Sequence, residues 1–194
     1  EEIIRAEGME KLTMRRLAEQ ADVSLRTPYN LFGSKTDVLI SLMEEAQFEL
    51  SPLGVGDEEL TIAEQLLGSL DRIEAFFESD EEYFRGIYAS IMTSDHPEAR
   101  ETAVSRSVGM ACVRLQRAAE NSELVPGTDT DSLGRHLAIQ LLAVLGMWGS
   151  GFFSNRESIA QVRQSWCAAL LQHCSETSHS ALTATYRTAI ETKG

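Results

Sequence analysis

The sequence contains few residues that break or oppose a helix. Only 4 of its 194 residues are proline. Runs of β-branched residues are scarce, whereas alanine, leucine, glutamate and arginine are abundant. Because these four residues have high helix propensity, the composition predicts an all-α protein. The hydrophobic share of 43% is sufficient for a sizeable core, and the length allows one or two domains.

Cysteine is also scarce, and the three cysteines are Cys112, Cys167 and Cys174. Cys167 and Cys174 lie about 10 Å apart along one expected helix, so they cannot form a disulfide there. The pattern predicts buried, reduced thiols in a cytoplasmic protein; a redox sensor is the alternative. No apolar run of about 18 residues and no signal peptide is recognisable, so we expect no membrane segment.

Residue groups that carry catalysis or bind metals are missing as well. The histidines, His96, His136, His173 and His179, show no HExxH spacing and no ligand spacing with cysteine or aspartate. The glycine-rich run 146–151 follows no expected strand, so it does not predict a phosphate-binding loop. We therefore expect a protein that is not an enzyme and that uses no metal and no cofactor.

Basic residues are outnumbered, 17 against 30 acidic ones, and the net charge is −13. Such a balance argues against a nucleic-acid partner, because phosphates attract a basic surface. The segment 13–36 differs, since its four basic residues exceed its two acidic ones and give a local balance of +2. A basic tip on an acidic body still predicts DNA binding through the tip.

The same segment has the start and stop signals of three helices. The expected helices are 14–21, 24–32 and 35 onward, and their expected caps are Thr13, Ser24 and Ser34. Asp22 and Val23 form the turn between the first two helices, and Gly33 ends the second. Two short helices joined in this way form a helix-turn-helix, whose second helix lies in the major groove of DNA.

Apolar and polar residues of this helix-turn-helix have separate expected roles. The residues expected to pack between the helices are Leu17, Ala18, Ala21, Val23, Leu31 and Phe32. The candidate DNA-binding residues are Thr13, Arg15, Ser24, Leu25, Arg26, Thr27, Tyr29, Asn30 and Lys35. Arg26 is the strongest candidate for a base contact, since arginine pairs bidentately with guanine. The alternative is that these arginines are only solvated surface charges.

From Gly8 to Leu39 the chain resembles the DNA-binding domain of the TetR family of bacterial transcriptional regulators. The residues that carry the resemblance, in fixed register, are Gly8, Leu12, Thr13, Met14, Leu17, Ala18, Ala21, Val23, Ser24, Thr27, Tyr29, Phe32, Ser34, Lys35 and Leu39. The resemblance implies that Thr13 and Lys35 bind phosphates and that Thr27 and Tyr29 touch the DNA backbone. Pro28 and Leu31 depart from the family pattern, which usually has a larger aliphatic residue and a histidine at these positions.

The clearest domain boundary is 51–58, where proline and glycine interrupt the helical pattern. We expect a DNA-binding domain over 1–50, including the start of a linking fourth helix, and an effector-binding and dimerisation domain over 51–194. Residues 1–7 resemble the end of a helix, with Ile3 and Ile4 facing the core. Family members begin earlier, so we expect an arm before residue 1 that is disordered or trimmed.

Beyond the boundary the hydrophobic periodicity remains helical. The expected helices are about 59–78, 81–94, 97–121, 130–153 and 157–174. On the third of these, the residues expected to face inward are Val104, Val108, Ala111, Leu115 and Ala118. The segment 181–190 is expected to be either a short helix that packs back or a loose tail.

The two helices expected over 130–174 are unusually apolar. Burial inside one subunit is one explanation, and an isologous four-helix interface between two subunits is the other. The resemblance implies the second explanation, because TetR-like proteins dimerise through their last two long helices. We therefore expect a homodimer through about residues 130–174.

Aromatic and methionine side chains from four expected helices predict a small-molecule pocket in the body. Together with two polar residues one turn apart, the candidate ligand-binding residues are Phe77, Phe84, Tyr88, Met92, Met110, His136, Gln140, Met147 and Trp148. Such apolar stripes are also typical of plain core, and His136 and Gln140 are equally compatible with a subunit interface. In the family this region holds an effector pocket.

These observations predict a cytoplasmic, nucleoid-associated transcriptional regulator. We expect a repressor that binds a palindromic double-stranded DNA operator and is released by a small apolar effector. The alternative is a DNA-binding regulator without a small-molecule effector, controlled by a partner protein or by thiol oxidation. An enzyme built on a helical bundle is a further rival, but no residue set supplies its chemistry.

Overall fold

The computed structural model describes residues 1–50, 60–93, 97–176, 179, 182–184 and 186–187, and within them it contains helices and no strands. The helices are α1 (Glu2–Glu7), the 3-10 turn η1 (Met9–Lys11), α2 (Met14–Gln20), α3 (Arg26–Phe32), α4 (Lys35–Leu50), α5 (Ile62–Ser79), α6 (Glu81–Met92), α7 (Pro97–Glu120), α8 (Thr130–Gly149) and α9 (Asn155–Leu170). The all-α prediction is therefore confirmed. No described helix is long and apolar enough to cross a membrane.

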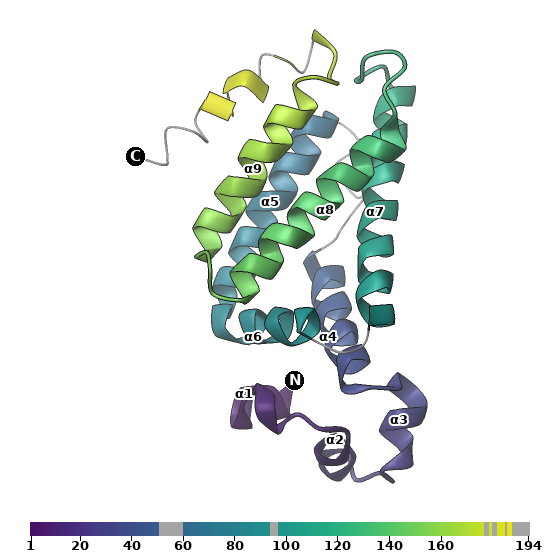
Figure 1. Cartoon of the computed structure of the whole chain (residues 1–194), viewed down its shortest axis with the longest axis vertical. Helices are drawn as coiled ribbons and strands as arrows, with labels where there is room; N and C mark the ends of the chain where they lie inside the picture. The colour runs from purple at the N-terminus through teal and green to yellow at the C-terminus, as the bar shows by residue number, and fades with distance from the viewer. Residues whose placement is uncertain (51–59, 94–96, 177–178, 180–181, 185, 188–194) are drawn as a thin grey trace.

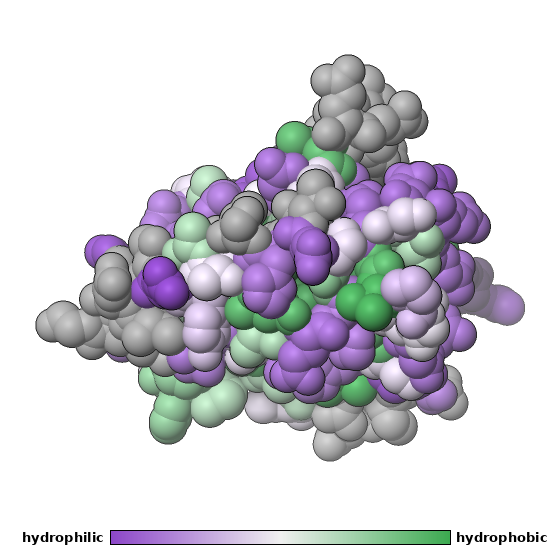
Figure 2. Space-filling model, turned by 90° about the horizontal axis from the view of Figure 1, so that it is seen from above, coloured by the Kyte–Doolittle hydropathy of each residue, from purple (hydrophilic) through white to green (hydrophobic). Residues whose placement is uncertain are grey.

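The helices form two groups along the long axis of the molecule (Figure 1). The segment from α1 to α3 lies at one end, and we call it the head; α5 to α9 form the body, and α4 connects the two. Helix α6 runs across the lower end of the body, between α1 and the other body helices. Seen from above, the opposite end of the body is largely hydrophilic, with smaller hydrophobic areas between (Figure 2).

Two hydrophobic clusters hold these helices together. The first lies in the upper body, where Leu70 of α5, Leu115 of α7, Leu137 of α8 and Val162 of α9 are completely or almost completely buried. Leu182, beyond α9, is also fully buried in this cluster. The chain after α9 thus packs back onto the body at this residue, as one of the two expectations for 181–190 required; Ala181 and Ile190 lie outside the described residues.

The second cluster is shared by the head and the body. Ile3, Leu12 and Leu39 from α1 to α4 join Ile87 of α6 and Trp148 of α8 in one continuous group of buried residues. The expectation that Ile3 and Ile4 face the core is confirmed, since both are buried. Burial of each side chain of this size stabilises the fold by about 1.5–3 kcal/mol. The shared cluster therefore holds the head against the body.

Side-chain caps set where the body helices begin. Thr61 and Glu64 form a reciprocal capping box at α5, and Ser154 and Glu157 form another at α9. At α8 the Asp129 carboxylate accepts a hydrogen bond from the Ser132 amide at 3.0 Å. These caps place the first residue of each helix within a few positions of the predicted start.

Several predicted ends and faces were wrong. Helix α8 ends at Gly149 rather than at residue 153, because Gly151 takes a positive φ of 79° and turns the chain. Helix α9 starts at Asn155 and ends at Leu170, before residue 174. Val104 is exposed, so only the second half of α7 follows the expected inward stripe. The predicted boundary at 51–58 lies outside the described residues.

Candidate nucleic-acid interface

The head contains the predicted helix-turn-helix, formed by α2 and α3. The Thr13 hydroxyl accepts a hydrogen bond from the Arg16 amide at 3.0 Å, which confirms Thr13 as the cap of α2. Asp22 takes a positive φ of 53° in the turn, and the Val23 amide closes it by donating to the Ala18 carbonyl at 3.0 Å. Gly33, with a φ of 84°, ends α3 as predicted.

The start of α3 differs from the prediction. Its cap residue is Leu25, which makes no side-chain capping bond, and the Ser24 hydroxyl instead pairs with the Thr27 hydroxyl at 3.0 Å. The predicted Ser24 cap is therefore wrong. The next helix does begin as expected, because the Ser34 hydroxyl accepts a hydrogen bond from the Asp37 amide at 3.2 Å.

Pro28 supplies the packing that the sequence suggested for other residues. It is the buried residue of α3, whereas Ala21, Val23, Leu31 and Phe32 are exposed, so four of the six predicted packing residues were wrong. Pro28 occupies the third position of the helix, where an amide has no intrahelical acceptor. The proline ring therefore removes no helical hydrogen bond here, and it is buried in a head where α3 contacts both α2 and α4.

The candidate DNA-binding residues of α3 point mostly into solvent. Arg26 and Asn30 are exposed, and Leu25 and Tyr29 are 50% and 51% exposed. Among the described residues Arg26 has no ion-pair partner. In Figure 1, α3 lies at the free end of the molecule, away from the body. A duplex would therefore meet this helix without a clash from α5 to α9.

The remaining candidates frame this helix. Thr13, Arg15 and Ser24 are exposed, whereas Thr27 and Lys35 are half-buried. Arg15 pairs with Glu19 at 3.1 Å in an exposed contact, and the Lys35 ammonium donates to the Met9 carbonyl at 3.0 Å. Both cations are held in place without being buried, so both remain within reach of a phosphate.

Arg16, unlike Arg26, is engaged in an ion pair within the described part of the head. It forms an ion pair with Glu7 at 2.5 Å, and its hydrogen bond lowers the pKa of the Glu7 carboxyl. This contact ties α2 to α1, so part of the local positive charge that the sequence showed is already neutralised within the head. The positive charge of Arg26 on α3 is not neutralised by an ion pair with any described residue.

In the body, part of the predicted ligand pocket forms a closed aromatic cluster. Phe77 stacks on Trp148 with ring centroids 4.5 Å apart, and Tyr88 contacts both rings at 5.6 and 5.7 Å. Phe84 lies 5.8 Å from Phe77. These four candidate residues lie together, and their rings fill the space between α5, α6 and α8.

The other candidate ligand residues do not join this cluster. Met110 and Met147 are exposed, and Met92 is half-buried. The Gln140 side-chain oxygen is buried and has no hydrogen-bond partner within the described chain. A buried amide oxygen without a donor is unfavourable, so a donor from a ligand or from a second subunit would stabilise it.

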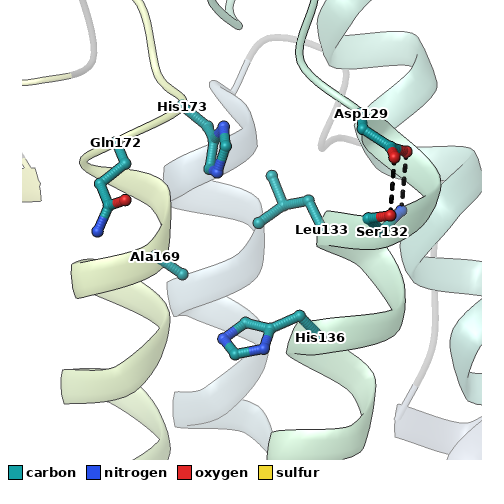
Figure 3. Close-up of a pocket in the computed structure, with 7 residues that line it drawn as sticks. All are labelled: Asp129, Ser132, Leu133, His136, Ala169, Gln172 and His173. Atoms are coloured by element: carbon teal, nitrogen blue, oxygen red, sulfur yellow. Dashed lines mark hydrogen bonds between the residues drawn. The ribbon is translucent and has the colours of Figure 1, made fainter.

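His136 lies elsewhere, in a groove between α8 and α9 with a volume of about 290 Å³. Figure 3 shows His136 and Leu133 on α8 opposite Ala169, Gln172 and His173. The sequence did not indicate that His136 and His173 line one groove, because the two residues come near each other only when α8 and α9 pack together. Among the described residues, no group of three or more acidic, histidine or cysteine side chains is placed to hold a metal ion.

These features define a protein with a helix-turn-helix DNA-binding fold carried on an all-helical body. Residues 1–42 match the family described as "Bacterial regulatory proteins, tetR family". No curated protein sequence matches the chain. Residues 1–42 thus resemble the DNA-binding domain of that family, and the solved structures below share the fold of most of the chain.

Solved structures share the fold over most of the chain. TylP, a TetR regulator from Streptomyces fradiae, has 15% identity and a TM-score of 0.66, with 97% of this chain and 90% of that one covered. Thermus thermophilus FadR, a TetR-family repressor solved with lauroyl-CoA, has 18% identity and a TM-score of 0.64, with 83% and 86% covered. A TetR-family regulator from Marinobacter aquaeolei VT8 has 14% identity and a TM-score of 0.56, with 97% and 93% covered.

Proposed function

We propose that the protein is a homodimeric, ligand-responsive repressor that binds a near-palindromic DNA operator in the nucleoid. The observation that carries this proposal is that Arg26 on α3 is exposed and has no ion pair with any described residue, within a helix-turn-helix at the free end of the molecule. Two such helices separated by about 34 Å would enter successive major grooves on one face of a duplex. The proposed domains are 1–50 for DNA binding and 51–194 for effector binding and dimerisation.

Each DNA contact in this proposal has a chemical role. Arg26 donates two hydrogen bonds to a guanine edge, and Asn30, one turn further along α3, contacts a neighbouring base or phosphate. The hydroxyls of Thr13, Ser24 and Thr27 and the phenol of Tyr29 bind the backbone, and Arg15 and Lys35 neutralise phosphates. These backbone contacts fix the register, and the base contacts select the sequence.

The proposed dimer uses the outer face of α8 with α9. Ile139, Ala143 and Met147 lie four residues apart along α8 and are all exposed, so they form one uncovered stripe. Phe152, just after α8, is 70% exposed. An isologous contact would cover this stripe in both subunits at once, and it would also cover the groove between His136 and His173.

The proposed effector acts on the second hydrophobic cluster. Lauroyl-CoA is bound by the FadR neighbour, and for this chain we propose a small, largely apolar molecule of unknown identity. Because the cluster of Phe77, Tyr88 and Trp148 is continuous with the core of the head, a ligand that separates these rings would shift α6 and α4. The ligand would favour a state in which the two heads no longer match the operator.

Three contacts couple the head to the body along this route. The Arg5 guanidinium lies 4.3 Å above the Tyr83 ring and pairs with Asp80, the cap residue of α6. Glu44 of α4 pairs with Arg106 of α7. A displacement of α6 or α7 would therefore be transmitted to both α1 and α4.

Thiol oxidation is the less favoured means of control. Cys167 and Cys174 are buried, and burial raises the pKa of both thiols, that of Cys174 to about 11. A reactive thiol needs the opposite environment, one that is accessible and lowers the pKa. Control by a partner protein remains the alternative, and it predicts no response of DNA binding to small molecules.

A selection experiment tests the proposal. The full chain is incubated with a pool of random duplexes, and bound DNA is recovered and sequenced over several rounds. We expect enrichment of an inverted repeat with half-sites about one helical turn apart. Recovery of unenriched DNA would reject sequence-specific regulation, and fatty acyl-CoA, fatty acids and other apolar metabolites titrated into a complex with the selected site would test the effector role.

A further inference from the structure

Two large apolar side chains are exposed on the face of α3 that carries Arg26. Leu25 and Tyr29 are four residues apart, so they lie next to each other on one side of the helix, and each is about half exposed, at 50% and 51%. Arg26 and Asn30 are also four residues apart and lie beside them. The outer face of α3 therefore presents an apolar strip (Leu25 and Tyr29) alongside a polar strip (Arg26 and Asn30).

The position of the buried residue fixes which way these strips face. Pro28 is buried, and on a helix with 3.6 residues per turn the Arg26–Asn30 strip lies opposite it, with the Leu25–Tyr29 strip between that side and Pro28. Leu31 is more exposed, at 72%, but it lies four residues after Thr27 on another side of the helix. Leu31 thus offers a matched apolar residue outside the strip.

The major groove contains one apolar group that such a strip can recognise. Among the unmodified bases, only thymine presents a methyl group there, at C5; cytosine has only a C–H at that position, and the nitrogen and oxygen groups of the base edges are hydrogen-bond donors or acceptors. An exposed leucine cannot bind a phosphate or a polar base edge. If α3 enters the major groove, burial of Leu25 against a polar base edge would leave base atoms without partners, whereas the thymine methyl is the largest apolar group that the groove offers.

We propose that Leu25 and the ring of Tyr29 receive the 5-methyl group of a thymine, so that this apolar strip is a determinant of operator sequence. The inference rests on the proposed DNA-binding function and adds a base to the one assigned to Arg26. Because Leu25 and Arg26 are consecutive residues and base pairs are spaced by about 3.4 Å, the thymine lies within about two base pairs of the guanine that Arg26 contacts. Each half-site of the operator contains both.

The test uses the duplex selected by the full chain, with single thymines replaced by deoxyuridine in both half-sites. Uracil pairs as thymine does and lacks only the methyl group, so the replacement removes the proposed contact alone. A buried methyl group contributes about 0.8 kcal/mol, equivalent to about a fourfold change in dissociation constant per half-site. We expect this loss at one thymine near the guanine and little change at the other thymines.

Variants of the protein assign the effect to a residue. Leu25→Ala should reduce the difference between the thymine and uracil duplexes, because only the Tyr29 ring then remains against the methyl group, whereas Leu31→Ala should retain the full difference. If the wild type discriminates the operator from scrambled DNA but binds every uracil duplex as well as the parent, the inference is wrong and the proposed function stands. A uracil effect of undiminished size in Leu25→Ala also overturns it. If the wild type shows no sequence preference at all, the proposed function fails and this inference with it.

Discussion

At the scale of single residues, Arg26 is the position whose loss should affect sequence reading most. It is exposed on α3 and has no ion-pair partner among the described residues, so its guanidinium is free to make two hydrogen bonds to guanine. We expect Arg26→Ala to weaken operator binding by about 1–3 kcal/mol and to relax the preference at that base pair. Binding curves with the operator and with duplexes substituted at the guanine would measure both effects.

Arg16→Ala is the matched control for this prediction. The same side chain is removed from the same head, but Arg16 is engaged with Glu7 at 2.5 Å and lies outside α3. It should leave base preference unchanged. Equal preference for operator and scrambled DNA in both the wild type and Arg26→Ala would remove the assigned role of Arg26.

The two buried thiols should react slowly in the native protein. Burial raises the pKa of Cys174 to about 11 and also raises that of Cys167. At pH 8 a thiol with a pKa of 11 is ionised to roughly one part in a thousand, and the thiolate is the reactive form. Titration with an aromatic disulfide reagent should therefore modify these two residues only after urea is added. Rapid native modification of either thiol, with loss of DNA binding, would favour thiol control.

In the helix-turn-helix, the sequence predicted which polar residues are exposed better than it predicted which apolar residues are buried. The exposure of Arg26 and Asn30 agrees with their being polar, but Leu31 and Val23 are apolar and exposed. With seven residues, α3 makes only about two turns. In so short a helix, periodicity does not determine which apolar residues face inward, and Pro28 takes the buried place because α2 and α4 approach α3 from that side.

At the scale of helices, the contact of α1 with α6 should stabilise the position of the head. Arg5 pairs with Glu1 at 2.8 Å and with Asp80, and its guanidinium stacks on Tyr83 at 4.3 Å. Because Arg5 is partly exposed, its ion pairs are screened by solvent, and we expect Arg5→Ala to lower the free energy of unfolding by only about 1 kcal/mol. Urea denaturation of the DNA-free protein would measure the change.

Arg15→Ala supplies the comparison for Arg5. Arg15 makes one exposed ion pair, with Glu19 at 3.1 Å, and removing a contact of this kind should change stability by no more than about 0.5 kcal/mol. If both variants lose the same small amount, the stacking of Arg5 on Tyr83 does not hold α1 to α6. A larger loss for Arg5→Ala would support the proposed route from body to head.

Helix starts could be predicted from the sequence because side-chain caps are local. The predicted caps Thr13 and Ser34 each accept a hydrogen bond from the amide three residues ahead, and such signals need no knowledge of the tertiary structure. Helix ends were less accurate, as at α9, whose expected end near residue 174 lies beyond Leu170. There the chain pairs with a distant segment instead, since the Val125 amide donates to the His173 carbonyl at 2.8 Å.

At the scale of the whole molecule, the shared core of head and body was not visible in the sequence. The apolar stripes of α1, α4 and α6 were each identifiable, but their meeting in one cluster depends on how α6 lies across the body (Figure 1). Likewise, four of the candidate ligand residues meet at Phe77 and Trp148, whereas His136 lies in the groove with His173. Long-range packing decided which of these candidates are neighbours.

Disruption of the exposed stripe on α8 should separate the proposed dimer. Ala143 lies between Ile139 and Met147 on that stripe, so Ala143→Glu would place two carboxylates in a dry, isologous contact. A buried charge without a partner is unfavourable by several kcal/mol, and we expect monomers at micromolar concentration in analytical ultracentrifugation. Ala119→Glu, an exposed position of α7, should leave the dimer intact. A dimer that survives Ala143→Glu would place the interface elsewhere.

The opposite charges of head and body make a prediction for the salt dependence of DNA binding. With a net charge of −13, the molecule must bind through its few available cations, so each phosphate contact should be visible in the salt slope. Lys35→Gln removes one charge while retaining a donor for the Met9 carbonyl that the ammonium now contacts at 3.0 Å. If Lys35 neutralises one phosphate in each subunit, the slope of log K against log salt should fall by about 2 for the dimer, at about 0.9 per phosphate.

The affinity should fall equally for operator and scrambled DNA, because a phosphate contact carries no sequence information. An unchanged slope would mean that Lys35 serves only to hold η1 against α4, and the phosphate contacts would then have to come from Arg15 and the hydroxyls around α3.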